Sequence, residues 1–388
     1  MSWDSSIGVL AVVPDNWNGI TYGRHQVLSR LANRFNVLWL EPALGWRDLL
    51  LPNGAKFLAR DQVSSPLRNL EVFDPGFRHP LFYAPLALAN WTARSRLRAA
   101  RERLIAAGAK RIVLYIWRDE FAPLLDLVEH DISVYHIDDE YSFDERDPPN
   151  SASELELLTR ADQVIIHSMQ LMKKKGGINP HTELIPNGVD FDSYANPREV
   201  PPDLARVPAP RIGYSGVIKW QLDFELLRRL ALARPNYSFV MVGPIRTMTG
   251  KEKHLRELQQ LPNVHFLGNK APNALPAYTQ NFDVCLMCYE TNNYTKYIYP
   301  LKLHEYLATG KPTVSAPLDA VQEFSSVVTI AQDEAQWLTA VDSGLSANSL
   351  VADKVAARRA VARAHDWEVI VDRVAATFRA ALARTRSS

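Results

Sequence analysis

Residues 299–312 are the most informative stretch of this chain, and they read Tyr-Pro-Leu-Lys-Leu-His-Glu-Tyr-Leu-Ala-Thr-Gly-Lys-Pro. Pro300 suits the first turn of a helix, where its missing N–H leaves no hydrogen bond unmade. Gly310 can adopt the left-handed conformation that ends a helix, and Pro312 prevents the helix from continuing. The stretch therefore predicts a short helix that is followed by a strand at residues 312–315.

Two faces of this expected helix carry different side chains. Leu303 and Leu307 are four residues apart and can face a core, whereas Lys302 and Glu305 are three apart on another face. A helix N-terminus with an adjacent lysine can bind a diphosphate, and a carboxylate one turn further can accept hydrogen bonds from the hydroxyls of a ribose. On spacing alone, a capped surface helix with a Lys–Glu pair is the more common explanation.

Length and charge narrow the class of protein. The chain has 388 residues, and a single core rarely grows beyond about 250–300 residues, so two domains are expected. Lysine and arginine number 44 against 43 acidic residues, a net charge of +1, which argues against a nucleic-acid partner.

The apolar run at residues 7–13 lacks the basic region of a signal peptide. No run approaches the about 18 apolar residues that cross a bilayer. We therefore expect a cytoplasmic protein.

Strand-like and helix-like segments alternate along both halves of the chain. In the first half the expected strands are residues 7–13, 37–41, 111–117, 133–137, 164–167 and 183–186, and the expected helices are 24–34, 94–107 and 120–130. In the second half the expected strands are residues 211–215, 237–243, 264–267 and 283–289, and the expected helices are 224–233, 252–260 and 273–280. This alternation predicts an α/β fold with two doubly wound, Rossmann-like parallel sheets.

A proline-rich segment suggests the domain boundaries. Residues 196–210 contain five prolines, which suit neither a helix nor a central strand, so this segment is expected to link the domains. The N-terminal domain is then residues 1–195, and the C-terminal domain is residues 211–365. Residues 366–388 have the apolar rhythm of a final helix.

Cys285 and Cys288 form a Cys-x-x-Cys pair. One such pair cannot complete a four-ligand zinc site, and the residues around it read as a strand. We expect both thiols to pack in a core.

The stretch at residues 299–312 closely resembles the nucleotide-sugar signature of GT-B glycosyltransferases, particularly the bacterial group 4-like enzymes that build exopolysaccharides and cell-wall glycans. The resemblance implies two Rossmann-like domains that face a cleft, with the acceptor on the N-terminal domain and the donor on the C-terminal one. It also implies that the helix at residues 366–388 crosses back to the first domain. In this family a basic residue and the helix N-terminus hold the donor diphosphate and the glutamate binds the ribose, roles that fall here to Lys302 and Glu305.

Neighbouring motifs extend the implied donor site. Residues 214–219 match the family's first donor-domain loop, which makes Lys219 a second cation for the diphosphate, and residues 267–270 match the loop that reads the base. Many members also carry a glutamate eight positions before the ribose glutamate, where it contacts the donor sugar, but Tyr297 stands at that position here. This departure from the retaining pattern favours an inverting transfer. The implied donor-binding residues are Lys302, Glu305, Lys219, Gly216, Leu301, Tyr297 and Gly268.

A loop after the first strand is a candidate for acceptor binding. Gly19 lies in this loop, and Arg24 and His25 begin the next helix. Ligands favour the carboxyl edge of a parallel sheet, and the resemblance places the loop in the interdomain cleft. A mobile loop with an Arg–His pair at a helix start explains these residues equally well.

A second polar segment, residues 134–141, reads Val-Tyr-His-Ile-Asp-Asp-Glu-Tyr at the end of another strand. An inverting transfer needs a carboxylate or histidine that takes the proton of the acceptor hydroxyl. Similar transferases, including the inverting glucuronosyltransferases of exopolysaccharide assembly, keep an aspartate near this point. Asp138 and Asp139 are therefore the candidate catalytic bases, with His136 a less favoured one. A strand-end turn whose acids cap the following segment is the alternative.

Residues 81–103 combine an apolar, aromatic run with five arginines. This composition is typical of a segment that lies on an anionic membrane. A core segment followed by a solvated helix explains it almost as well.

Together these features predict a glycosyltransferase that moves a sugar from a UDP- or GDP-linked donor to a glycan or lipid-linked acceptor. No metal or other cofactor is expected, because a lysine, a helix dipole and backbone N–H groups can neutralise the leaving diphosphate. Two alternatives stay open. One is a sugar-nucleotide 2-epimerase of the same fold, which needs no acceptor, and the other is a non-catalytic protein that binds a nucleotide sugar.

Overall fold

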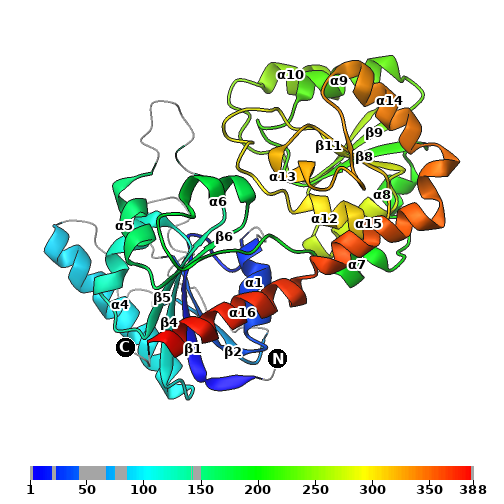
Figure 1. Cartoon of the computed structure of the whole chain (residues 1–388). Coiled ribbons are helices and arrows are strands. Elements are labelled where there is room, and N and C mark those ends of the chain that lie inside the picture. The colour runs from blue at the N-terminus through cyan, green and yellow to red at the C-terminus, as the bar shows by residue number, and fades with distance from the viewer. Residues whose placement is uncertain are drawn as a thin grey trace. The chain divides into compact units, whose positions relative to one another are not determined.

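The computed structural model describes residues 3–19, 23–42, 67–74, 85–140, 142 and 150–385, which contain two parallel β-sheets with helices on them (Figure 1). The chain divides into two compact units. The first unit joins Met1–Ile185 to Ile370–Ser388, and the second unit is Pro186–Val369. The predicted fold class, two doubly wound Rossmann-like domains, is confirmed.

The first unit is built on a seven-stranded sheet in the order β3-β2-β1-β4-β5-β6-β7, and every pairing in it is parallel. All residues of β2 and β5 are buried, as expected for a parallel sheet that is covered on both faces. The strands are β1 (Asp4–Val12), β2 (Phe35–Leu40), β3 (Leu70–Phe73), β4 (Arg111–Ile116), β5 (Ile132–Ile137), β6 (Gln163–Ile166) and β7 (Thr182–Leu184).

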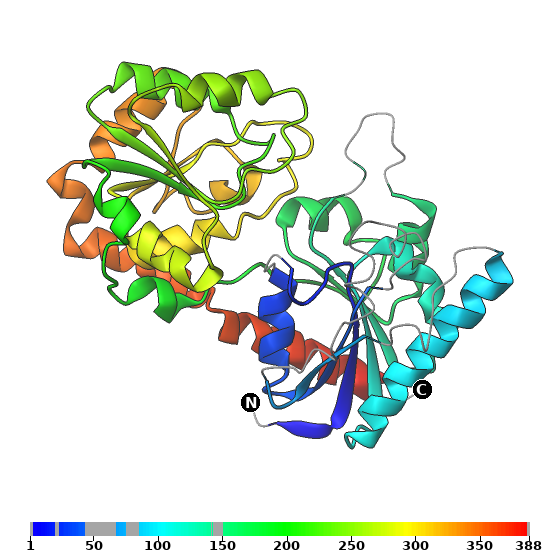
Figure 2. The ribbon, with the colours of Figure 1, turned by 180° about the vertical axis from the view of Figure 1, so that it is seen from behind.

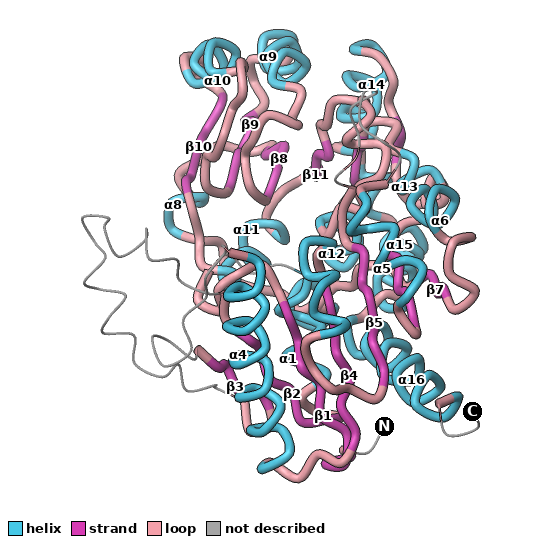
Figure 3. Tube along the Cα trace, turned by 90° about the vertical axis from the view of Figure 1, so that its left-hand side faces the viewer, coloured by secondary structure: helices cyan, strands magenta, loops and turns pink. Residues whose placement is uncertain are grey.

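Helices cover both faces of this sheet. The helices of the first unit are α1 (Gly23–Leu31), α4 (Leu86–Ala106), α5 (Ala152–Arg160), α6 (Met169–Lys175) and most of α16 (Trp367–Arg384). Helix α4 packs on one face, where Gly8 leaves room for Leu104, and α16 packs on the other, where the ring of Phe378 stacks on Phe35. Figure 3 shows α4 and α16 on opposite sides of the strands, and in Figure 2 the cyan α4 lies in front of the sheet.

One expected helix has a different form. The segment expected as a helix at residues 120–130 is a 3-10 helix, η2 (Asp119–Asp126), which contains Pro123. Proline lacks the N–H that an α-helical hydrogen bond needs, and its ring clashes with the preceding turn. The tighter 3-10 geometry accommodates it.

The second unit has a six-stranded parallel sheet in the order β10-β9-β8-β11-β12-β13. Its strands are β8 (Arg211–Ser215), β9 (Ser238–Val242), β10 (Val264–Gly268), β11 (Val284–Met287), β12 (Thr313–Ser315) and β13 (Thr329–Ile330). Its α-helices are α7 (Phe191–Ala195), α8 (Pro202–Ala205), α9 (Phe224–Ala233), α10 (Glu252–Gln259), α11 (Leu275–Gln280), α12 (Lys302–Thr309), α13 (Asp319–Gln322), α14 (Glu334–Gly344) and α15 (Ala352–Ala364).

The chain divides at a different place from the expected linker at residues 196–210. The first unit ends at Ile185, so the proline-rich segment lies inside the second unit. There it forms α8, whose Leu204 is buried and whose Asp203 accepts hydrogen bonds from Lys270 at 2.7 Å and from the Tyr278 hydroxyl at 2.8 Å. Two of the five prolines that suggested a linker lie at the start of this short helix, Pro201 at its N-cap and Pro202 as its first residue, because proline is accepted at a first helical position.

Helix α12 follows its sequence pattern. Leu303 and Leu307 are fully buried in the core of the second unit. Gly310 ends the helix with a φ of 78°, the left-handed conformation that was predicted. Cys285 and Cys288 are free and buried, and burial raises the pKa of each thiol to about 12. The prediction that they are core residues is confirmed.

Candidate functional site

Helix α12 presents Glu305 next to a tyrosine of α7. The Glu305 side chain is partly buried, and the Tyr194 hydroxyl is close enough to influence the pKa of its carboxyl. Burial raises the pKa of the Glu305 carboxyl, while the Lys302 ammonium and the Tyr194 hydroxyl act in the opposite direction. Tyr194 is itself buried.

The ammonium of Lys302 is surrounded by aromatic groups. Its Nζ donates a hydrogen bond to the Tyr289 hydroxyl at 2.7 Å. The same Nζ lies 5.1 Å from the ring centre of Tyr214 and 5.4 Å from that of Tyr289. Gly216 lies beside this lysine, because a Cβ atom at Gly216 would be 3.0 Å from Cε of Lys302. The structure therefore brings together two residues of the predicted donor site, Lys302 and Gly216.

The other predicted donor residues belong to the same unit. The Nζ atom of Lys219 lies 5.8 Å from the ring centre of Tyr294. The Nζ atom of Lys296 lies 5.7 Å from the ring centre of Tyr297. Gly268 ends β10 with a φ of 72°, and Leu301 immediately precedes α12 with helical backbone angles. The donor roles of these four residues stay predictions.

In the first unit, Arg24 and Asp138 form an ion pair although they are 114 residues apart in sequence. Nε and one terminal nitrogen of Arg24 donate to Oδ2 of Asp138 at 3.0 and 2.8 Å. The other terminal nitrogen of Arg24 contacts the carboxylate of Asp15. An oxygen that already accepts two hydrogen bonds from a guanidinium is poorly available for a further proton. Asp138 is therefore better suited to orienting Arg24.

Asp139 is engaged differently. Its Oδ1 accepts a hydrogen bond from the backbone N–H of Glu140 at 2.9 Å, and the residue is partly exposed. The buried Glu140 anchors this turn, because its carboxylate binds Lys174 at 3.0 Å and Lys175 at 2.9 Å. The sequence analysis did not identify this anchor, since Lys174 and Lys175 lie in a later helix.

The two histidines of the predicted acceptor side are buried, and their acceptor roles stay predictions. His136 is buried, its Nδ1 lies 2.5 Å from the Tyr115 hydroxyl, and its ring stacks on Trp117. His25 is also buried, and its Nε2 lies 3.2 Å from the carbonyl oxygen of Trp17. Burial lowers the pKa of both imidazoles, so both are uncharged at neutral pH. Gly19 lies in a turn in which its N–H donates to the Asn16 carbonyl at 2.9 Å.

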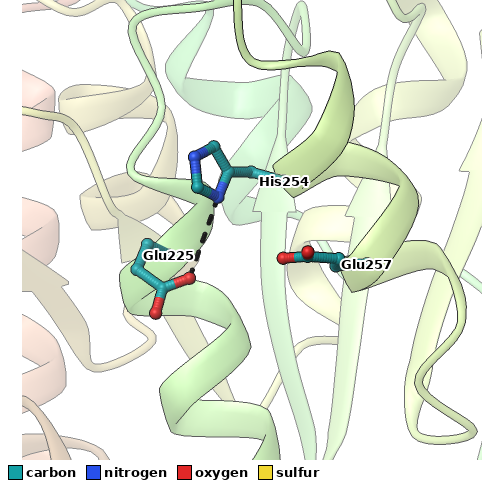
Figure 4. A group of neighbouring side chains, drawn as sticks. All are labelled: Glu225, His254 and Glu257. Atoms are coloured by element: carbon teal, nitrogen blue, oxygen red, sulfur yellow. Dashed lines mark ion pairs between the residues drawn. The ribbon is translucent and has the colours of Figure 1, made fainter.

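One cluster of possible metal ligands lies on α9 and α10 of the second unit (Figure 4). The ligand atoms of Glu225, His254 and Glu257 lie within 4.8 Å of one another. However, Arg228 binds both carboxylate oxygens of Glu225, at 2.7 and 2.9 Å, and Lys253 lies 3.6 Å from the carboxylate of Glu257. The basic side chains already balance these carboxylates, so the cluster is better described as an ion-pair network. The expectation that no metal takes part stays a prediction.

Known proteins resemble this chain in sequence and in fold. Residues 209–347 match the family model described as "Glycosyl transferases group 1". "Putative teichuronic acid biosynthesis glycosyltransferase TuaH" of Bacillus subtilis (strain 168) is 29% identical over 232 residues, which are 56% of this chain and 57% of that protein. The chain therefore matches little more than half the length of this curated relative.

Two solved structures share the fold over nearly their whole length. Anabaena Alr3699/HepE in complex with UDP and glucose has a TM-score of 0.65 and 17% identity, over 96% of this chain and 99% of that one. Sucrose-phosphate synthase (tll1590) from Thermosynechococcus elongatus has a TM-score of 0.71 and 17% identity, over 97% and 99%. The chain thus has the GT-B fold of glycosyltransferases, and its residues 209–347 form a glycosyltransferase group 1 domain, as the resemblance in its sequence predicted.

Proposed function

We propose that the chain is a glycosyltransferase that moves a sugar from a nucleoside-diphosphate donor to a glycan or lipid-linked acceptor in the synthesis of a cell-wall or extracellular polysaccharide. The observation that carries this proposal is the pair formed by Lys302 and Glu305 on α12, inside the matched domain. The match to a teichuronic acid biosynthesis glycosyltransferase and the likeness to a protein solved with UDP and glucose support it.

In this proposal, the second unit binds the donor, which is UDP- or GDP-linked. The N-terminal N–H groups of α12 and the ammonium of Lys302 stabilise the diphosphate as it leaves, without a metal ion. The carboxylate of Glu305 accepts hydrogen bonds from the ribose hydroxyls. A carboxylate has about four acceptor positions, enough for two ribose hydroxyls.

The donor assignment predicts the effect of replacing Glu305. The Glu305→Ala variant should bind UDP or GDP more weakly by about 1.5–3 kcal/mol, the range for a hydrogen bond to a charged group. Isothermal titration calorimetry of parent and variant measures the difference. Glu252→Ala, which removes an exposed carboxylate at the start of α10, is the matched control. Equal affinity of the Glu305→Ala variant and the parent for each nucleotide would refute the ribose role.

We propose that the acceptor binds to the first unit and that Asp139 is the general base of an inverting transfer. The base removes the proton of the acceptor hydroxyl while that oxygen attacks the sugar carbon and the diphosphate leaves. Asp138 is the weaker candidate, because its Oδ2 already accepts two hydrogen bonds from Arg24.

The base assignment predicts a loss of turnover without a loss of donor binding. Asp139→Asn should lower kcat by about 10²–10⁴-fold, the usual contribution of general-base catalysis. Its affinity for UDP or GDP should hold, because Asp139 and the donor residues belong to different units. Asp126→Asn, which removes an exposed carboxylate of the first unit, is the control.

Two outcomes would contradict this assignment. A fully active Asp139→Asn variant would exclude Asp139 as the base, and a loss in Asp138→Asn alone would transfer the role to Asp138. A product that keeps the donor's anomeric configuration, read by NMR, would exclude an inverting mechanism.

We also propose that the protein works at the cytoplasmic face of a membrane and contacts anionic lipid through α4. Leu86 is 74% exposed and Trp91 is 65% exposed on the first turns of this helix, and Arg94 and Arg98 follow on its exposed surface. Apolar and aromatic side chains beside arginines are typical of interfacial segments. Residues 81–84 of the predicted segment lie outside the described residues. Among the described helices, none has the length and apolarity to span a bilayer.

Membrane contact predicts co-sedimentation with anionic but not with neutral vesicles. Replacing Arg94 and Arg98 by glutamine should weaken binding to anionic vesicles by about 1 kcal/mol per arginine. A control with Arg206 and Arg256 replaced by glutamine removes two exposed arginines of the second unit. Equal recovery with both vesicle types, or the same loss in both double variants, would refute a role of α4.

A further inference from the structure

Lys302 is held by neutral groups. Its Nζ donates to the Tyr289 hydroxyl at 2.7 Å and lies over the rings of Tyr214 and Tyr289. Within the part of the chain that the structure describes, no carboxylate forms an ion pair with it. An ammonium has three N–H donors, and only one is used by the tyrosine hydroxyl. The lysine therefore keeps N–H donors for an anionic ligand.

The tyrosines that surround this ammonium are themselves fixed. Tyr214 and Tyr289 are almost fully buried. The hydroxyl of Tyr214 donates to the Val217 carbonyl at 2.9 Å. Tyr289, which follows β11, forms an isolated antiparallel β-bridge with Leu222. A lysine side chain loses up to about 2 kcal/mol of rotamer entropy when it is ordered. Rigid tyrosines can impose this order before a ligand arrives.

Gly216 also lies next to the ammonium of Lys302. A Cβ atom there would lie 3.1 Å from Nζ of Lys302 and 3.4 Å from the Tyr214 hydroxyl. Gly216 also has a φ of 141°, which side-chain-bearing residues rarely adopt. A side chain at residue 216 would therefore crowd the ammonium of Lys302, and glycine avoids this clash.

From these contacts we propose that Tyr289 is a positioning residue, whose hydroxyl holds the Lys302 ammonium in the place where the donor diphosphate binds. The inference rests on the proposed function and adds a specific requirement to it. Preorganisation of this kind increases affinity by removing the ordering cost of the lysine from the binding step. Tyr289 then acts on the diphosphate only through Lys302.

A double-mutant cycle tests this inference. Tyr289→Phe removes the hydroxyl and keeps the ring, and it should weaken binding of UDP or GDP by about 3- to 10-fold, because part of the cost of ordering Lys302 returns to the binding step. In a Lys302→Met background the same substitution should cause no further loss, because the group that Tyr289 positions is gone. Tyr237→Phe removes a hydroxyl that donates to Asp342 at 3.1 Å in the same unit and is the matched control. Titration calorimetry gives the four affinities.

The outcomes separate this inference from the proposed function. A parent protein that binds neither UDP nor GDP overturns both. A parent that binds, together with an unchanged Tyr289→Phe variant or an equal loss in the Lys302→Met background, overturns the role of Tyr289 alone. Thermal unfolding verifies that each variant is folded. If Tyr289→Phe does not fold, Gly216→Ala places a methyl group against Lys302 and displaces its ammonium, and unchanged nucleotide binding by that variant overturns the inference.

Discussion

Burial of one face of α12 is the constraint on which the candidate donor site depends. Leu303 and Leu307 are fully buried in the core of the second unit, and the left-handed Gly310 ends the helix. A helix fixed in this way cannot rotate without exposing two leucines, at a cost of about 1.5–3 kcal/mol for each. Lys302 and Glu305 are therefore held on the remaining surface, where tyrosines from other elements contact both.

Much of the fold could be predicted from the sequence. Buried parallel strands read as apolar runs, so strands such as β4 and β11 could be recognised without a structure. Local signals of helix ends placed α12, because Gly310 adopts the conformation that its residue type suggests. Two prolines outside α12 were misleading signals of local structure. Pro123 lies in a 3-10 helix, and Pro202 begins α8 inside a segment that was expected to be a linker.

The candidate sites could be predicted only in part, because their contacts join residues that are distant in sequence. Spacing along α12 identified Lys302 and Glu305, but not Tyr289 or Tyr194, which come from other elements and contact them. Likewise, Asp138 and Asp139 were identified at the end of β5, whereas the pairing of Asp138 with Arg24 joins this strand end to the start of α1, which follows β1. This pairing favours Asp139 over Asp138 as the candidate base.

The central claim is that the second unit binds a nucleoside diphosphate, and thermal unfolding with a panel of UDP-, GDP- and ADP-sugars tests it most directly. A ligand that binds only the folded state at 100 times its dissociation constant stabilises a protein by about 2.7 kcal/mol. The account predicts a clear rise in the unfolding temperature with a UDP- or GDP-sugar. An unchanged unfolding temperature with every nucleotide sugar at millimolar concentration would contradict it.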